Sequence, residues 1–137
     1  MKKRVVLIGA FTLLIWPCMA HAETLFTWPF AAVSPWSLDF GELRLGESAT
    51  NCFLLENVGS DTLVGTATVP PPFKIQSGAS YRLTRNGAQV VTVIYTPDGA
   101  PTNTQVVTFT GGPGKVEVRV TGRLSTKRWP YYLKRKK

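Results

Sequence analysis

Short segments in which apolar and polar residues alternate one by one dominate the chain from residue 36 to residue 122. In the clearest of them, residues 116–121, three valines alternate with Glu117, Arg119 and Thr121. A period of two places alternate side chains on opposite faces of a strand, so one face of this segment suits a core and the other suits water. No window has the 3.6-residue spacing of a convincing amphipathic helix. The pattern therefore predicts an all-β domain.

Turn-forming residues separate these segments at intervals of roughly 8–12 residues, which is typical of a sandwich or barrel of short strands. Asn86-Gly87 is a strong tight-turn signal, the glycine-rich stretch 111–114 suits a hairpin loop, and the prolines at 70–72 end a strand. We therefore expect a single immunoglobulin-like β-sandwich of about seven strands over residues 36–122. Its core is expected to contain Phe40, Phe53, Leu55, Phe73, Leu83, Val93, Tyr95, Phe109, Val116, Val118 and Val120.

A series of short motifs follows in order along this segment: Leu38-Asp39-Phe40-Gly41, Leu45-Gly46, Phe53-x-Leu55-x-Asn57-x-Gly59, Phe73, Val91-x-Val93-x-Tyr95-x-Pro97 and Val118-x-Val120-x-Gly122. Together they resemble the Hydin-type (ASH) immunoglobulin-like domain, within the group of sandwiches that includes the major sperm protein and pilus-chaperone domains. The resemblance implies a seven-stranded sandwich and a non-enzymatic module that binds or spaces other proteins. It implies no catalytic residues.

Four positions in these motifs suit bends and ends of strands. Gly41 and Gly46 allow the edge strand to bend or kink. Asn57 is suited to a turn, through either a left-handed backbone or a hydrogen bond from its side chain. Pro97 suits the place where a strand leaves the sheet, because proline has no N–H to donate. None of these roles is catalytic.

The first 22 residues have the three-part layout of a secretory signal peptide. A positive region at residues 2–4 precedes an uncharged apolar run at residues 5–16, and Ala20-His21-Ala22 is a small-x-small cleavage pattern. The apolar run is about a dozen residues long, whereas a membrane-spanning helix needs roughly 20. We expect cleavage after Ala22 and export to the periplasm or the cell surface.

A lipoprotein signal is the alternative interpretation of this segment, with Cys18 as the residue that carries the lipid. That kind of signal has small residues before its cysteine, whereas Trp16 and Pro17 are bulky or rigid. The ordinary signal peptide is therefore the preferred interpretation, and Cys18 is then an apolar residue that is lost on cleavage.

Cleavage after Ala22 removes residues on which many catalytic and metal sites are built. The single histidine is His21, and of the two cysteines only Cys52 remains in the exported chain. This composition excludes an intramolecular disulfide, zinc sites built on His and Cys, and Ser–His or Cys–His nucleophile pairs. We therefore expect no enzyme activity, no catalytic or metal-binding residues, no cofactor and no small-molecule substrate.

Three remaining side chains carry groups that are reactive in other settings. Asp39 and Glu42 suggest a carboxylate pair, but acid–base catalysis needs a pocket that shifts their pKa values, and solvated acids at a strand end are the simpler interpretation. Cys52 is turned away from the core if its neighbour Phe53 faces the core. We interpret Cys52 as a small residue that is either covered by the preceding segment or exposed, with an intermolecular disulfide as the alternative.

The basic residues gather at the two ends of the chain. The formal net charge is +8, yet the body between the signal peptide and residue 123 carries six basic and eight acidic residues. A nucleic-acid-binding domain has its basic stripe on the folded body, so we expect no nucleic acid partner. Residues 23–35, which are rich in proline and aromatic side chains, are expected to form a leader segment that packs on the edge of the domain.

The C-terminal tail, residues 123–137, is the strongest candidate for a functional site. It contains no acid, it mixes aromatic with basic side chains, and Pro130 discourages a helix. The residues expected to bind a partner are Arg123, Lys127, Arg128, Trp129, Tyr131, Tyr132, Lys134, Arg135, Lys136 and Lys137. A tail that only improves solubility is the alternative without a partner.

Two functions fit a sandwich with such a tail. The first is a non-catalytic module of the cell envelope that docks into a protein assembly through its sheet edges and its tail, because open edges accept strands and Trp, Tyr and Arg are frequent hot spots. The second is a periplasmic or secreted binder of anionic surfaces, such as lipid headgroups or lipopolysaccharide, through the tail alone. The sequence does not identify the envelope protein in the first case.

Overall fold

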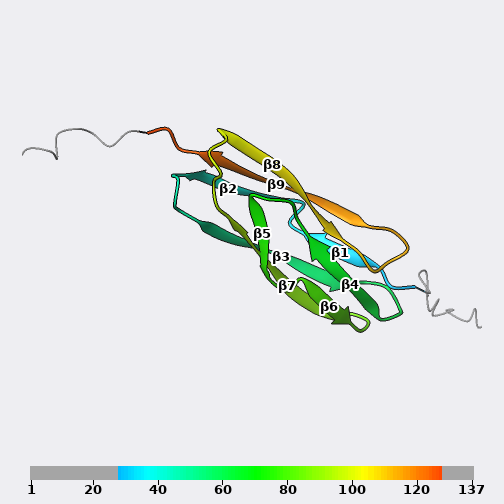
Figure 1. The fold of residues 1–137 in the computed structure, drawn as a ribbon. Coiled ribbons are helices and arrows are strands. Elements are labelled where there is room, and N and C mark those ends of the chain that lie inside the picture. The colour runs from blue at the N-terminus through cyan, green and yellow to red at the C-terminus, as the bar shows by residue number, and fades with distance from the viewer. Residues whose placement is uncertain (1–27, 128–137) are drawn as a thin grey trace, which may run out of the picture.

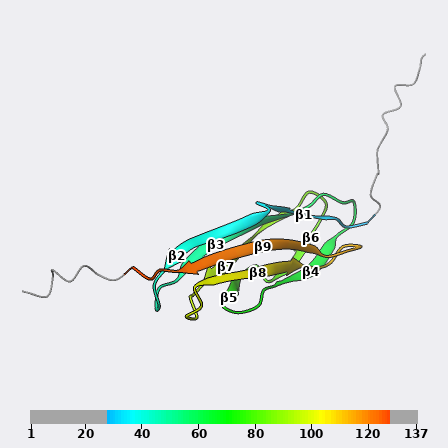
Figure 2. The same cartoon turned by 90° about the horizontal axis from the view of Figure 1, so that it is seen from above.

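A computed structural model describes residues 28–127, which form nine strands arranged in two sheets packed face to face (Figures 1 and 2). In chain order the strands are β1 (Ala31–Ser34), β2 (Ser37–Leu43), β3 (Ala49–Asn57), β4 (Leu63–Thr68), β5 (Phe73–Ser77), β6 (Ser80–Leu83), β7 (Ala88–Tyr95), β8 (Thr102–Phe109) and β9 (Val116–Leu124). The four-stranded sheet has the order β1-β3-β7-β5, and the five-stranded sheet has the order β2-β9-β8-β4-β6. The expected all-β immunoglobulin-like sandwich is confirmed, with nine strands rather than about seven.

The strands extend past the expected sandwich at both of its ends. β1 begins at Ala31, inside the segment expected to be a leader, and its residues Ala31 and Val33 are buried in the core. β9 continues to Leu124, two residues into the expected tail. The expected signal peptide, residues 1–22, and most of the tail lie outside the described residues.

The first strand of the sandwich changes sheets. β1 pairs with β3 in the four-stranded sheet, with Ala31 opposite Asn57. After Pro35 and Trp36 the chain continues as β2, which pairs in parallel with β9 of the five-stranded sheet. The two residues between the strands carry the chain across the sandwich, and this crossing divides one edge into two short strands. The division accounts in part for the larger number of strands.

The core fills the space between the sheets as the alternation predicts. Ten of the eleven residues expected in the core are buried: Phe40, Phe53, Leu55, Phe73, Leu83, Val93, Tyr95, Phe109, Val118 and Val120. Three aromatic rings meet in it, with the centroid of Phe73 4.7 Å from that of Tyr95 and 5.5 Å from that of Phe40. Val116 is only partly buried, because it begins β9 at an open end of the sandwich.

The turns follow the residues that predicted them. Asn86 has a φ of 61° in the tight turn between β6 and β7, and Gly87 donates its N–H to the carbonyl of Thr84 at 2.8 Å. Gly41 has a φ of 74° where the register of β2 against β9 shifts between Asp39 and Glu42. A left-handed backbone is readily adopted by glycine, so Gly41 permits the expected bend of the edge strand.

Asn57, at the end of β3, is buried and ties together three parts of the chain. Its Oδ1 accepts hydrogen bonds from the N–H of Phe30 at 3.2 Å and from that of Gly59 at 3.1 Å. Its Nδ2 donates to the carbonyls of Asp61 at 2.6 Å and Leu83 at 3.0 Å. The side chain therefore uses both of its polar atoms, joining the entry to β1, the turn after β3 and the end of β6.

Replacement of Asn57 by alanine is expected to lower the free energy of unfolding by about 3 kcal/mol or more, because buried partners left unsatisfied cost about 1–3 kcal/mol each. Asn57→Asp is also expected to destabilise, since a carboxylate cannot donate to the carbonyls of Asp61 and Leu83. Urea denaturation measures both effects. Asn51→Ala, at an exposed position of β3, is the control and is expected to change the free energy by about 0.5 kcal/mol at most. A cost below about 1 kcal/mol for Asn57→Ala contradicts the assigned role.

Candidate interaction site

The structure describes two of the ten tail residues that the sequence singles out. Arg123 lies in β9 and Lys127 is the last described residue, and both are exposed. Arg128, Trp129, Tyr131, Tyr132, Lys134, Arg135, Lys136 and Lys137 lie outside the described residues. The structure therefore shows where the tail begins, which is the first requirement for assigning it a binding surface.

The start of the tail is held along β2. Nη2 of Arg123 lies 3.3 Å from Oδ2 of Asp39, and Nζ of Lys127 lies 3.8 Å from Oε2 of Glu42. The backbone N–H of Ser125 donates to the carbonyl of Leu43 at 2.8 Å. We call this region, in which residues 123–127 run beside β2, the tail base. The ion pairs are exposed, so each contributes little to stability, but with the backbone bond they fix the direction in which the tail leaves.

The acids that suggested a carboxylate pair face this tail base. Besides Arg123, the Oδ1 of Asp39 accepts the N–H of Gly41 at 2.8 Å, which supports the bend in β2. Glu42 pairs with Lys127 instead of sharing a site with Asp39. Both side chains are about half exposed. This geometry fits the interpretation of solvated acids at a strand end, each with its own cation.

The loop between β7 and β8 supports the tail base from the other side. The carbonyl of Pro101 accepts the N–H of Leu124 at 3.0 Å. Within the loop, Oδ1 of Asp98 accepts the N–H of Ala100 at 3.1 Å and the Nδ2 of Asn103 at 3.2 Å. Donation by the Ala100 N–H, and secondly by Asn103, lowers the pKa of the Asp98 carboxyl from its ordinary value. The charged carboxylate thus holds the loop that supports Leu124.

β2 is an end strand of the five-stranded sheet, and residues 123 and 124 of the tail base pair with its inner side, so only β2 separates the tail base from an open sheet edge. Among the end strands of the two described sheets, β2 has seven residues, whereas β1, β5 and β6 have four, five and four. Its bend at Gly41 and its charged residues Asp39 and Glu42 are features that discourage unspecific pairing of edges. A partner strand therefore has to match this edge locally.

Cys52 is exposed on β3, on the outer face of the four-stranded sheet. Its cross-strand neighbour is Thr92 of β7, and the next outward pair on the same face is Leu54 with Val90. Of the two positions that alternation allowed, covered or exposed, the structure has the exposed one. An intermolecular disulfide remains a prediction.

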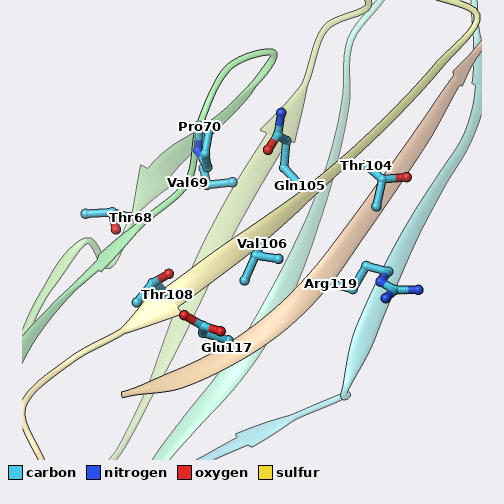
Figure 3. A pocket seen from close by; sticks show the side chains of 9 residues that line it. All are labelled: Thr68, Val69, Pro70, Thr104, Gln105, Val106, Thr108, Glu117 and Arg119. Carbon is cyan, nitrogen blue, oxygen red and sulfur yellow. The ribbon is translucent and has the colours of Figure 1, made fainter. Parts of the chain in front are cut away.

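A broad polar groove crosses the outer face of the five-stranded sheet (Figure 3). It has a volume of about 620 Å³ and is lined by Thr68, Val69, Pro70, Thr104, Gln105, Val106, Thr108, Glu117 and Arg119. Glu117 and Arg119 are the outward residues of the alternating β9 segment, so their exposure was visible in the sequence. The sequence did not show that these two residues lie near residues 68–70, because that proximity depends on the pairing of β4 and β9 with β8. Threonine and amide side chains of this kind suit the polar rim of a protein interface.

Within residues 28–127 no group of three or more His, Cys, Asp or Glu side chains is arranged to hold a metal ion. The same residues include no helix that is long and apolar enough to cross a membrane.

The sandwich is similar to solved structures whose sequences are distant. No protein-family model and no curated protein matches the sequence. The ASH/PapD-like domain 7 of human CEP192 is 17% identical, with a TM-score of 0.62, over 72% of this chain and 87% of that domain. The E. coli chaperone DraB is 11% identical, with a TM-score of 0.59, over 74% of this chain and 58% of the chaperone. The major-sperm-protein-like SSP-19 of Caenorhabditis elegans is 13% identical, with a TM-score of 0.52, over 67% and 98%.

These similarities give the chain the immunoglobulin-like fold shared by ASH, major sperm protein and PapD-like domains, as the motifs implied. The chain spans little more than half of DraB, so it corresponds to only part of that chaperone. At this level of identity the comparisons establish the fold alone, and the function has to be argued from the surface.

Asn103→Ala is expected to raise the pKa of Asp98 toward its ordinary value of 3.8, because it removes the side-chain hydrogen-bond donor to that carboxylate. The pKa is lowered in the folded state, so the contribution of Asp98 to stability is present above the ordinary pKa. It is lost as the pH falls through the lowered one. Titration of the Asp98 carboxyl carbon by NMR measures the shift, with Asn51→Ala as a control that leaves the Asp98 titration unchanged. An unaltered midpoint in Asn103→Ala contradicts the assignment.

Proposed function

We propose that this chain is an exported, non-catalytic interaction module of the cell envelope, which docks onto a protein partner through the β2 edge and the adjoining basic tail. The observation that carries this proposal is the position of the tail base. Residues 123–127 run beside β2, an end strand, and are held there by Asp39, Glu42 and the carbonyl of Leu43. We expect a partner that adds a strand to the open side of β2 to lie one strand away from the tail base and to contact the tail as well.

The two contacts have complementary physical roles. Strand addition supplies backbone hydrogen bonds, and the pleat of the edge selects side chains at alternate positions of the partner. The tail supplies Trp129, Tyr131 and Tyr132 together with arginine and lysine, and Trp, Tyr and Arg are the residues that most often dominate binding energy. Because the tail base is already fixed at Ser125, fewer residues have to be ordered on binding.

Export is part of the proposal and depends on residues 1–22. We expect mass spectrometry of the protein recovered from the periplasm or the cell surface to show an N-terminus at Glu23. Replacing Ala20 and Ala22 by leucine is expected to block cleavage, because the small-x-small pattern is lost. A mature protein that retains residues 1–22, or that begins at a lipidated Cys18, contradicts this part of the proposal.

Binding to an anionic surface is the second candidate function, and one observation favours it. Residues 123–137 carry seven basic side chains and no acid, and of these Arg123 and Lys127 pair with acids of the sandwich. A polybasic segment with interfacial aromatic residues is attracted to lipid headgroups or lipopolysaccharide. The attraction falls within a Debye length, which is about 10 Å at 0.1 M salt and about 3 Å at 1 M.

Two variants of the tail distinguish docking on a protein from binding to an anionic surface, because one retains the charges and the other retains the aromatic rings. The aromatic variant, Trp129→Ala with Tyr131→Ala and Tyr132→Ala, keeps every charge. The charge variant, Lys134→Gln with Arg135→Gln and Lys136→Gln, keeps every aromatic ring. The control for the charge variant is Lys74→Gln with Arg82→Gln and Arg85→Gln, which removes the same charge from exposed positions of the sandwich.

Pull-down of the tagged chain from its own cell envelope, at 0.1 M and 1 M salt, provides the measurement. For docking on a protein we expect capture to survive 1 M salt and to fall at least tenfold in the aromatic variant, with little change in the control. The second function predicts a different result. Association is then lost in the charge variant and at 1 M salt, and the chain binds vesicles of anionic lipid without capturing a protein. Unchanged capture in both tail variants contradicts a role for the tail.

A further inference from the structure

The first residues of β9 have an open edge. β8 pairs with β9 from Val116 to Arg123, so this side of β9 is covered from its first residue. The pairing of β2 with the other side of β9 begins only at Arg119, opposite Ser37. No strand in residues 28–127 pairs with the β2 side of Val116, Glu117 and Val118. The five-stranded sheet thus has a gap in the line of β2.

The chain that precedes β2 forms the opposite wall of this gap. Residues 31–34 do not continue the line of β2 but cross to the other sheet as β1. Between the two edges lies a groove of about 440 Å³, which we call the notch, lined by Phe30, Ala31, Ala32, Val33, Trp36, Lys115, Val116 and Glu117. Its lining is mostly apolar, and Lys115 and Glu117 pair with each other at 2.8 Å. Trp36, at the crossing, is 78% exposed.

We propose that the notch binds the aromatic tail segment, residues 129–133, of a second copy of this chain as an added strand on β9. The inference builds on the proposed role of the tail as a contact and assigns one of its partners. It makes the contact between copies directional, since the tail of one molecule occupies the notch of the next.

The order of residues in the segment suits this edge. In an extended strand Trp129, Tyr131 and Leu133 project from one face, so all three can enter the apolar notch together. The backbone groups of alternate residues also point to the same side of a strand. If the backbone groups of Trp129 and Tyr131 form hydrogen bonds with β9, those of Pro130 point away from β9. The missing N–H of Pro130 then costs no hydrogen bond between the two strands.

The length of the tail favours a second copy over the same molecule. β9 runs from the notch to the tail base, and Figures 1 and 2 place β1 and the start of β9 at one end of the sandwich and the C-terminal end of β9 at the other. From Ser125 back to the near end of the notch, opposite Trp36, is about 20 Å at the usual rise of a strand. Trp129 is four residues past Ser125, a span of at most about 14 Å. The tail therefore cannot place Trp129, Tyr131 and Leu133 together in its own notch.

A contact of this kind is heterologous, since the two molecules use different surfaces. Each copy then retains a free notch at one end and a free tail at the other, so chains of copies form unless a ring closes. The β2 edge at the tail base stays open in such a chain, which leaves it available to another protein.

Analytical ultracentrifugation of the purified mature chain, from low to high concentration with a reducing agent present, tests the proposal. The weight-average mass is expected to rise with concentration beyond that of a dimer. Trp36→Ala and the aromatic tail variant are each expected to raise the dissociation constant at least about 30-fold, as loss of a hot-spot aromatic does. Leu45→Ala, at another exposed apolar residue, is the control and is expected to leave association unchanged.

A mixture of the two variants provides the decisive measurement. Trp36→Ala retains a working tail, and the aromatic tail variant retains a working notch, so a mixture of the two is expected to form a dimer and nothing larger. Failure of the mixture to associate, a symmetric dimer that survives both changes, or a mature chain that stays monomeric overturns the proposal. A chain that associates without residues 129–133, through the notch filled by residues 23–27, also overturns it. If a monomeric chain captures an envelope protein, the proposed function is supported and the contact between copies is contradicted.

Discussion

The buried side chain of Asn57 is the contact on which the arrangement of the strands depends. Its carboxamide meets the chain where it enters β1, where it turns after β3 and where β6 ends. Its backbone also takes part, since its N–H donates to Gly87 and its carbonyl accepts from Asn86. An apolar residue at this position leaves backbone groups from several elements without partners in a dry environment, where each such loss is costly. The amide therefore specifies the end of the sandwich, although it contributes no apolar packing.

The entry to β1 is fixed at that end of the sandwich, and the chain then crosses from one sheet to the other. The chain joins the four-stranded sheet for Ala31–Ser34 and only then reaches the line of β2. No described strand pairs with the β2 side of β9 over Val116–Val118, and Trp36 is exposed at the surface. The same crossing that completes one sheet thus opens the other. Trp36 is therefore the exposed aromatic residue on which the proposed contact between copies depends.

Charge and apolar contact are separated along the long axis of the sandwich. At one end the tail base pairs Arg123 and Lys127 with acids of β2, and the carboxylate of Asp98 holds the supporting loop. At the other end the notch is lined mostly by apolar side chains. Exposed ion pairs contribute little energy but orient a segment, whereas apolar grooves contribute affinity. The two proposed contacts therefore use opposite ends of the sandwich.

The sequence by itself determined the fold class and most of the core. Alternation of Val118 and Val120 with charged residues requires a strand with one dry face, and Asn86-Gly87 requires a tight turn, whatever the rest of the chain does. The ordered series of motifs, of which the one around Asn57 and Gly59 is part, likewise resembled this group of folds. The same local reasoning pointed to the tail, whose composition is visible without a structure.

Only the tertiary structure decided what lies beside what. Residues 23–35 read as a leader because prolines and aromatics obscure their alternation, yet Ala31 and Val33 are buried once β3 is beside them. Val116 fits the alternation as well as Val118 does, but it is only partly buried because it begins β9 at an open end of the sandwich. The tail base and the notch depend on pairings between residues about 80 positions apart, such as Asp39 with Arg123. Periodicity reports the environment of a side chain along one strand, and it holds no information about the neighbour across the sheet.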